Sequence, residues 1–375
     1  MDFEYTAEQQ LLRDTVTEFL AARYDLDKSR SAARVGIGWQ PEIWRAFATE
    51  VGILGAALPE EVGGFDGGPV ETLIIAEAFG GALVVEPFVD TVVVGAGLLR
   101  RAGGARAQEM LRGIVSGEVI TALAALEADS GYNLAKVSTT ARRDGEDWVL
   151  DGAKTVVTSA PLATHLLVTA RTPDSSGVSL FLVEAGAAGL TLHSYRTIDE
   201  RRAADITLEG VRVPADALLG SEGAADDSLA TAADEAIAAV CAEAIGAMRR
   251  VLDDTVEYAK QRRQFGVPIA SFQVLQHRMV DMHLELEQAI AATYLVTLKL
   301  GAPNDERARA AAAAKATIAR AARFLGQSAV QLHGAMGMTE ELAIGHFFKR
   351  LTAIQYEWGT ADQHVARYAA LTRPA

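Results

Sequence analysis

The sequence predicts an α+β protein with three parts. These are an N-terminal helical domain over residues 1–116, a central antiparallel β domain over 117–220 and a C-terminal four-helix bundle over 221–375. Apolar residues recur at helical spacing before about residue 115 and after about residue 225. Between these regions, short β-rich runs alternate with turn residues. These two changes of pattern predict the domain boundaries.

Helical signals open the chain. Thr6 and Gln9 have the spacing of a capping box, in which each side chain satisfies a free amide of the first helical turn. A glycine-rich loop over residues 63–69 precedes a second predicted helix over 70–79. Four apolar residues after the capping box repeat on one helical face, which predicts that this face is buried: Leu12, Val16, Phe19 and Leu20.

The central region is typical of a small barrel or sandwich. Asp151 and Gly152 follow the run Trp148–Leu150 and predict a hairpin turn. Turn residues separate further β-rich runs, and each run predicts a strand: Thr155–Thr158, Leu166–Ala170, Val178–Val183 and Leu190–His193.

The last part is rich in alanine and predicts long helices. Two of them cover residues 274–300 and 306–332, with a turn over 301–306 between them. Such lengths suit a four-helix bundle. An earlier helix carries a stripe of residues expected to face the core: Ile245, Met248, Leu252, Thr255 and Ala259.

Composition excludes several function classes. Half of the 375 residues are apolar, and 35 Lys and Arg against 49 Asp and Glu give a net charge of −14. Without a basic cluster, a nucleic-acid partner is not expected. The single Cys241 and the spacing of the histidines predict neither a disulfide framework nor a metal site. The acidic first residues and the short apolar stretches predict a cytoplasmic protein without membrane insertion.

The usual dinucleotide, phosphate-loop and serine-nucleophile signatures are absent, but three segments stand out. In the first, paired arginines and an aromatic residue end a long helix between Tyr258 and Ile269. Arginine at a helix end can cap carbonyl groups, which accounts for Arg263. The Arg262 guanidinium, alternatively, has the shape to bind a phosphate.

The other two segments lie nearer the C-terminus. Gly334 and Gly337 break an alanine-rich helix, either as a simple corner or to let a ligand approach closely. The run Tyr356–Thr360 places a carboxylate and an indole at a glycine turn. A lone glutamate in such a turn is usually a solvated surface group.

Together the three segments resemble the acyl-CoA dehydrogenase family. The chain carries the family signature Tyr-Ala-x-x-Arg-x-x-Phe-Gly-x-x-Ile from Tyr258 to Ile269. It also carries the family corner Gln-x-x-Gly-Gly-x-Gly from Gln331 to Gly337, with alanine at 335. Residues 61–71, 345–352 and 359–364 resemble the subgroup that contains the pimeloyl-CoA dehydrogenase small subunit and actinobacterial steroid side-chain enzymes.

The resemblance implies FAD as cofactor, lying between the β domain and the bundle, with part of its site donated by a neighbouring subunit. Arg262 and Gln264 would then contact the pyrophosphate side of a neighbour's flavin. Phe272 and the corner formed by Gln331, Gly334 and Ala335 would border its adenosine portion.

Thr158 would lie against the flavin ring, and Thr360 would contact FAD beyond the catalytic carboxylate. The implied reaction is α,β-desaturation of an acyl-CoA thioester. A carboxylate removes the α-proton while the β-hydrogen leaves as hydride to the flavin. Hydrogen bonds to the thioester carbonyl stabilise the developing enolate.

The position of the base departs from the family pattern. The family motif ends Tyr-Glu-Gly-Thr, but Trp358 occupies the Glu position here and Glu357 lies one residue away. Some family members carry the base on an earlier helix, where this chain has Ala236 with Glu235 beside it. A one-residue shift turns a helical side chain by about 100°. Glu357 and Glu235 are therefore the candidate catalytic residues.

The flavin loop of the β domain also departs from the pattern. Tyr132 replaces a serine expected to meet the pyrophosphate, and Val156 replaces the usual tryptophan. This chain's own half of a flavin site is therefore altered, whereas the half that it donates is retained. We expect the small subunit of an α2β2 tetramer, in which a homologous large subunit supplies the base and the main flavin cradle.

Three alternatives stay open. The chain could be a self-sufficient homo-oligomeric dehydrogenase, a non-catalytic acyl-CoA-binding scaffold subunit, or a flavin oxidase or monooxygenase with the same fold. The expected partners are an acyl-CoA from lipid or steroid catabolism and an electron-transfer flavoprotein or similar acceptor. The subgroup suggests dicarboxyl-CoA, aromatic-ring or steroid side-chain thioesters.

Overall fold

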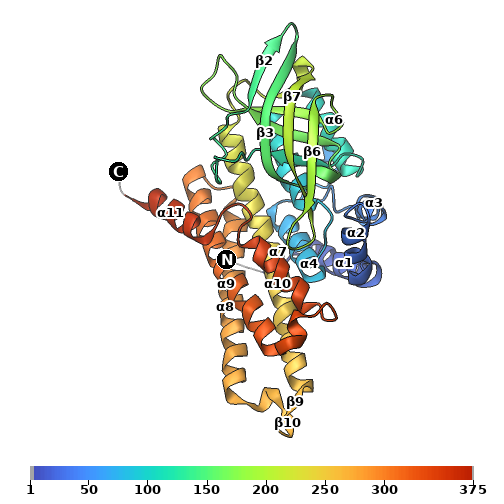
Figure 1. Cartoon of the computed structure of the whole chain (residues 1–375), viewed down its shortest axis with the longest axis vertical. Coiled ribbons are helices and arrows are strands. Elements are labelled where there is room, and N and C mark those ends of the chain that lie inside the picture. The colour runs from blue at the N-terminus through green and yellow to red at the C-terminus, as the bar shows by residue number, and fades with distance from the viewer. Residues whose placement is uncertain (1–3, 374–375) are drawn as a thin grey trace. The chain divides into compact units, whose positions relative to one another are not determined.

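The computed structural model describes residues 4–373 and divides the chain into two compact units (Figure 1). The bundle unit contains the chain up to Ala22, Pro69–Val84 and Ile237 onward. The sheet unit contains Arg23–Gly68 and Val85–Ala236. Residues 1–3 and 374–375, at the ends of the first and last predicted domains, lie outside the description. The two predicted boundaries between the three domains remain a prediction.

The bundle unit is helical, as expected from its alanine-rich sequence. The predicted capping box is confirmed, because the Thr6 and Gln9 side chains each accept a hydrogen bond from the other residue's amide, at 3.2 and 3.1 Å. The predicted stripe that runs from Ile245 to Ala259 on α7 (Asp226–Gln261) is also confirmed as buried. The main elements are α1 (Ala7–Arg23), α4 (Pro69–Ala82), α7 (Asp226–Gln261), β9 (Arg263–Gln264), β10 (Val267–Pro268), α8 (Gln273–Lys299), α9 (Asn304–His333), α10 (Ile344–Ile354) and α11 (Ala361–Thr372).

Reciprocal glycines bring α4 and α7 into backbone contact. A Cβ added at Gly80 would lie 1.8 Å from the Glu243 carbonyl oxygen, and one added at Gly246 would lie 1.9 Å from that of Glu77. Neither position can hold a larger residue without separating the two helices. This close packing fixes the stretch of α7 that carries Glu243.

The sheet unit holds two four-stranded sheets, ordered β1-β4-β5-β8 and β2-β3-β7-β6. Trp148 and Phe181 pack edge to face in the core cluster, with ring centroids 5.3 Å apart. The strands are β1 (Thr121–Ala124), β2 (Thr140–Asp144), β3 (Asp147–Thr158), β4 (His165–Ala170), β5 (Ser179–Glu184), β6 (Leu190–Arg196), β7 (Arg202–Val213) and β8 (Leu218–Leu219).

The first part of α7, up to Ala236, belongs to this unit and follows the sheets in sequence. Four further helices precede the sheets. They are α2 (Leu26–Val35), α3 (Pro41–Thr49), α5 (Ala96–Ala102) and α6 (Gly104–Val115). A π-helical turn, η2 (Val89–Gly95), leads directly into α5. The expected order of helical, β and helical regions is therefore confirmed.

Two details of the β region differ from expectation. β1 pairs with β4 in parallel rather than antiparallel fashion, since the long excursion through β2 and β3 returns the chain in the same direction. The hairpin turn predicted at Asp151 and Gly152 is wrong, because β3 runs through both residues. Gly152 sits at a register shift, where an added Cβ would lie 2.8 Å from the Thr139 Cα. Glycine is needed here for a bulge rather than for a turn.

Within residues 4–373, no helix is both long enough and apolar enough to cross a membrane.

Candidate functional site

The first group of expected site residues lies at one end of the bundle unit. After α7 the chain turns through the hairpin β9–β10, with left-handed backbone at Phe265 and Gly266. The Arg263 guanidinium donates to the Gly266 carbonyl at 2.9 Å and so closes the hairpin. Arg262 is exposed, and among the described residues its guanidinium has no hydrogen-bond or ion-pair partner. Its planar set of donors is therefore available to a ligand.

The hairpin and the corner after α9 are joined by an aromatic stack. Tyr258, one turn before Arg262, stacks on His333 with ring centroids 4.2 Å apart, and its hydroxyl donates to the His333 carbonyl at 3.4 Å. Burial lowers the pKa of His333, which favours a neutral ring in the stack. The stack brings Arg262 and Gly334 to the same end of the unit.

The surface of this end is open. Gly334 has a left-handed φ of 60°, and nothing lies within 4 Å of an added Cβ. Gln331 and Ala335 beside it are exposed. Phe272 is half-buried and contacts Phe265 edge to face, with centroids 6.2 Å apart. An available guanidinium, an exposed amide and exposed ring edges fit the phosphate and the adenine of a nucleotide, so this donor set fits FAD.

Gln264 and Thr360 already have partners within the chain. The Gln264 side-chain amide donates to the Arg263 carbonyl at 2.8 Å. Thr360 is the N-cap of α11 and forms a capping box with Gln363. The motif at Gly359 and Thr360 therefore has a local structural role, and any contact of Thr360 with FAD would come in addition to it.

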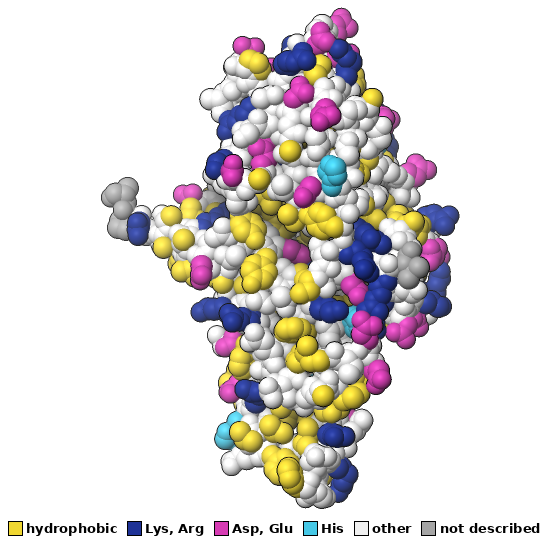
Figure 2. Space-filling model, viewed as in Figure 1, with side chains coloured by type: hydrophobic (Ala, Val, Ile, Leu, Met, Phe, Trp, Pro, Cys, Tyr) yellow, Lys and Arg dark blue, Asp and Glu magenta, His cyan; other side chains and the backbone are white. Residues whose placement is uncertain are grey.

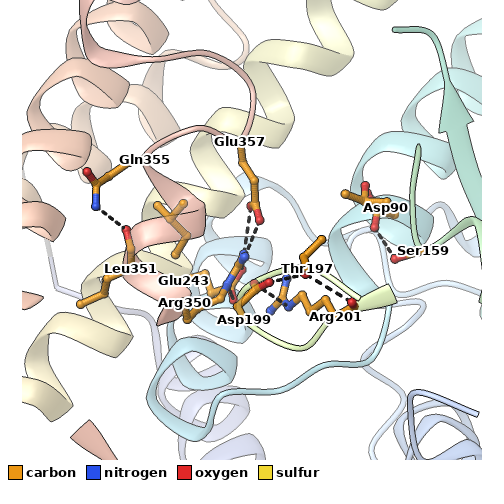
Figure 3. A network of polar contacts seen from close by, with 12 residues as sticks. Asp90, Ser159, Thr197, Asp199, Arg201, Glu243, Arg350, Leu351, Gln355 and Glu357 are labelled. Atoms are coloured by element: carbon orange, nitrogen blue, oxygen red, sulfur yellow. Dashed lines mark hydrogen bonds and ion pairs between the residues drawn. The ribbon is translucent and has the colours of Figure 1, made fainter. Parts of the chain in front are cut away.

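Glu357 follows α10 and lies against Arg350 (Figure 3). Arg350 hydrogen-bonds to both of its carboxylate oxygens, with 3.0 Å between Nη2 and Oε2. On its other edge the guanidinium binds Glu243 in bidentate fashion, with distances of 2.7 Å and 2.8 Å. The Arg350 and Glu243 side chains are each 3% exposed, whereas that of Glu357 is 24% exposed. Glu357 would therefore have to leave Arg350 before it could accept a proton.

A buried lysine fixes the turn that carries Glu357. The Lys315 ammonium donates to the carbonyl oxygens of Ile354 and Gly359, at 2.8 and 2.9 Å. Trp358, at the family's Glu position, has a left-handed φ of 57°, and its carbonyl is 2.8 Å from His364 Nε2. The turn therefore has a defined shape, and its carboxylate is held one residue before the expected position.

Glu235 is held in a similar way within the sheet unit. It is in the first part of α7 and pairs with Arg101 of α5, at 2.8 and 3.0 Å. Gly97 leaves room for this pair, because an added Cβ would lie 2.7 Å from Glu235 Oε2. Both candidate bases are thus bound by arginines, and they belong to different units.

Glu127 and Lys154 hold the start of the altered flavin loop in the sheet unit. The buried Lys154 ammonium binds the Glu127 carboxylate at 2.8 Å. Burial alone would raise the pKa of Glu127, but hydrogen bonds from Lys154 and Thr139 lower it to about 2. Tyr132 and Val156, the two replacements in this region, are both exposed.

Thr158 lies at the end of β3, and its hydroxyl donates to Asp90 Oδ1 at 3.0 Å. The sequence motifs gave no signal for Asp90. The contact of Arg350 with Glu243 and that of Lys315 with the turn that carries Glu357 likewise join residues far apart in the sequence. Only position 350 could have been found earlier, because it belongs to the subgroup match over residues 345–352.

Comparison with known proteins covers nearly the whole chain. Family models described as acyl-CoA dehydrogenase N-terminal, middle and C-terminal domains match residues 6–118, 122–211 and 229–370. Acyl-CoA dehydrogenase FadE12 of Mycobacterium tuberculosis is 32% identical over 354 residues, covering 91% of this chain and 90% of the relative.

Solved structures agree. A chain of the solved ChsE4-ChsE5 complex from M. tuberculosis superposes with a TM-score of 0.90 at 27% identity, and the match covers 100% of this chain and 100% of that chain. An FAD complex of PigA superposes with a TM-score of 0.90 at 26% identity, and the match covers 99% of this chain and 98% of PigA. The resemblance first drawn from Tyr258–Ile269 and Gln331–Gly337 is confirmed: the chain belongs to the acyl-CoA dehydrogenase family of oxidoreductases.

Proposed function

We propose that this chain is the small subunit of an FAD-dependent acyl-CoA dehydrogenase of α2β2 composition. A homologous large subunit would supply the catalytic base and most of the flavin cradle. One observation carries the proposal: the exposed Arg262 lacks a partner among the described residues, whereas both candidate bases are bound by arginines. Arg262 therefore remains available to bind a cofactor in a neighbouring subunit, whereas the carboxylates of Glu357 and Glu235, which could act as this chain's own base, are held in ion pairs.

The donated groups would hold the nucleotide part of a neighbour's FAD. The Arg262 guanidinium would bind the pyrophosphate, joined by Gln264 if its amide leaves the Arg263 carbonyl. Gln331, Gly334 and Ala335 would border the adenosine together with the ring of Phe272. Bound FAD accepts the hydride from the β-carbon, and these residues fix its position rather than change its chemistry.

The exposed apolar surface of the bundle unit supports assembly with another chain. Phe265 at the tip of the hairpin is 91% exposed. On α8, Val280, Leu284, Leu295 and Leu298 are each at least 50% exposed, and their spacing places them on one face. Figure 2 shows hydrophobic side chains gathered at the end that carries β9 and β10. A surface of this kind is typical of a protein–protein interface.

The nature of the partner is supported by a relative. The ChsE4-ChsE5 complex is described as a complex of two named proteins, and this chain is similar over its full length to a chain in it. We propose a similar pairing here. The substrate would be a dicarboxyl-CoA, an aromatic-ring thioester or a steroid side-chain thioester, and the acceptor an electron-transfer flavoprotein or a similar protein. A cytoplasmic location remains a prediction.

A self-sufficient homo-oligomer is the second candidate, because Glu357 is still partly exposed beside the family's base position. Co-expression with the homologous chain encoded nearest to this one distinguishes the two. We expect acyl-CoA-dependent dye reduction only when both chains are present. Turnover by this chain alone, as a homo-oligomer with stoichiometric flavin, would contradict the two-subunit form. No turnover and no flavin in either preparation would favour a scaffold role.

A further inference from the structure

His333 is the last residue of α9, and neighbouring groups in the bundle unit hold its ring in place. The ring stacks on Tyr258, with centroids 4.2 Å apart and 27° between the two planes. Gly337 approaches the same side chain, because an added Cβ there would lie 3.1 Å from the His333 Cβ. His333 is only 5% exposed. Its ring is therefore fixed at the corner that leads into Gly334.

A hydrogen bond determines which nitrogen of this ring carries the proton. His333 Nδ1 lies 2.9 Å from the carbonyl oxygen of Ala329, which can only accept a hydrogen bond, so Nδ1 must donate. Burial lowers the pKa of His333 and favours the neutral ring, and this effect outweighs the opposing influence of the Ala329 carbonyl and the Asp254 carboxylate on α7. A neutral ring with its proton on Nδ1 has a lone pair on Nε2.

This lone pair is available to a ligand. Among the described residues, Nε2 of His333 has no hydrogen-bond partner, and it does not belong to the polar atoms that are fully enclosed. The next residue, Gly334, leaves open space, since nothing lies within 4 Å of an added Cβ. The Arg262 amide donates to the Tyr258 carbonyl at 2.8 Å, which ties the guanidinium to the other partner of the stack. An acceptor and a phosphate-binding group thus flank one aromatic stack.

We infer that Nε2 of His333 accepts a hydrogen bond from the adenosine part of a neighbouring subunit's FAD. The inference rests on the proposed function, in which Arg262 and the Gln331 corner hold that nucleotide. Adenosine carries suitable donors in two places, the exocyclic amine of adenine and the hydroxyl groups of the ribose. A lone pair can accept from either, whereas the Arg262 guanidinium can only donate and suits the phosphates. The two groups would therefore bind different parts of one nucleotide.

FAD binding to the flavin-free complex tests this contact. The complex with the homologous partner is prepared unaltered and with His333→Phe, and each is titrated with FAD while flavin fluorescence is followed. Phenylalanine keeps a flat ring against Tyr258 but has no hydrogen-bond acceptor. The Kd for FAD should rise about 3- to 10-fold, which corresponds to the loss of one neutral hydrogen bond.

Two analogues of FAD separate a contact with the ligand from a change in the shape of the protein. One analogue carries purine in place of adenine and so lacks the amine, and the other lacks both hydroxyl groups of the adenosine ribose. If the amine is the donor, His333→Phe should not weaken binding of the purine analogue. If a ribose hydroxyl is the donor, the variant should not weaken binding of the analogue that lacks the hydroxyl groups.

A second variant and a control keep the result interpretable. His333→Leu also lacks an acceptor, so its cost should depend on the ligand in the same way, although its total cost should be larger because the stack is lost as well. His193→Phe makes the same change of side chain at an exposed position on β6 and should leave the Kd for FAD unchanged. Thermal unfolding of each complex checks that the fold is kept.

The outcomes for the inference and for the proposed function differ. If His333→Phe has no effect on FAD binding, or weakens FAD and both analogues equally, the inference is overturned. The proposed function still stands in that case, provided that Arg262→Met weakens FAD binding to the same complex. If the unaltered complex does not bind FAD, both are overturned.

Discussion

Arg350 hydrogen-bonds to both carboxylate oxygens of Glu357, the acid that lies one residue before the family's base position. Glu243 holds the opposite edge of the same guanidinium from inside the bundle unit. Glu357 is therefore part of a partly buried ion-pair network, and this arrangement suits a structural role better than proton removal.

Glu357→Gln should leave turnover of the two-subunit enzyme within about threefold of the unaltered protein. Stability should fall by about 1–3 kcal/mol, since one edge of the buried Arg350 loses a charged partner. Steady-state kinetics and denaturant unfolding measure the two effects. A loss of turnover of about 100-fold or more would instead identify Glu357 as the base.

Arg350→Met is the matched change on the other side of the pair. It leaves Glu243 buried without its guanidinium, so the cost should be larger, about 3–5 kcal/mol. Unfolding of both variants under the same conditions provides the comparison. If the two variants lose the same amount of unfolding free energy, Arg350 is not the central residue of the buried network.

Glu235→Gln should also leave turnover almost unchanged. The carboxylate pairs with Arg101, and both side chains are only about one-fifth exposed, at 19% and 21%. We expect a loss of about 1–2 kcal/mol in the free energy of unfolding. If the variant is stable but inactive, the base belongs to this chain and the self-sufficient alternative is favoured.

Acid should destabilise the sheet unit through Glu127. Its pKa is about 2 in the folded chain and near 4.5 when unfolded, so the unfolded chain binds the proton more readily. The stabilisation is complete above pH 4.5 and is lost as the pH falls toward 2. It amounts to about 2 kcal/mol once solvent screening is allowed for. The free energy of unfolding should be measured across this pH range. In Glu127→Gln it should no longer show the loss of about 2 kcal/mol that protonation of Glu127 causes.

The sequence could predict what depends on local pattern. The capping box at Thr6 and Gln9 and the end of the long helix beside Arg262 are set by residues a few positions apart. Gly152 was misjudged because the same residue serves a turn or a bulge, and only the close approach of Thr139 decides between them. Local pattern could not place β1 beside β4, since strand pairing is set by the whole fold.

The candidate site shows the same division. The motifs at Arg262 and Gln331 were identifiable by spacing, but the stack that joins them connects Tyr258 with His333, 75 residues later. Asp90 meets Thr158 across 68 residues, and Glu243 meets Arg350 across 107. These contacts determine which carboxylates are engaged in hydrogen bonds or ion pairs, and no short-range sequence pattern predicts them.

Arg262→Met should weaken FAD binding by about 10- to 100-fold, because a charged, two-pronged hydrogen bond to phosphate is lost. Lys260→Met is the matched control. It removes the same charge from a nearby exposed pair with Glu257 and should change the affinity by less than about twofold.

Flavin content tests the central claim most directly. FAD per protein chain is measured for this chain alone, for the complex with its homologous partner, and for that complex carrying Arg262→Met. We expect little flavin in the chain alone, a full complement in the complex and a marked loss with Arg262→Met. Stoichiometric FAD in the isolated chain, or a complex that keeps its flavin without Arg262, would contradict the claim that this subunit completes a neighbour's site.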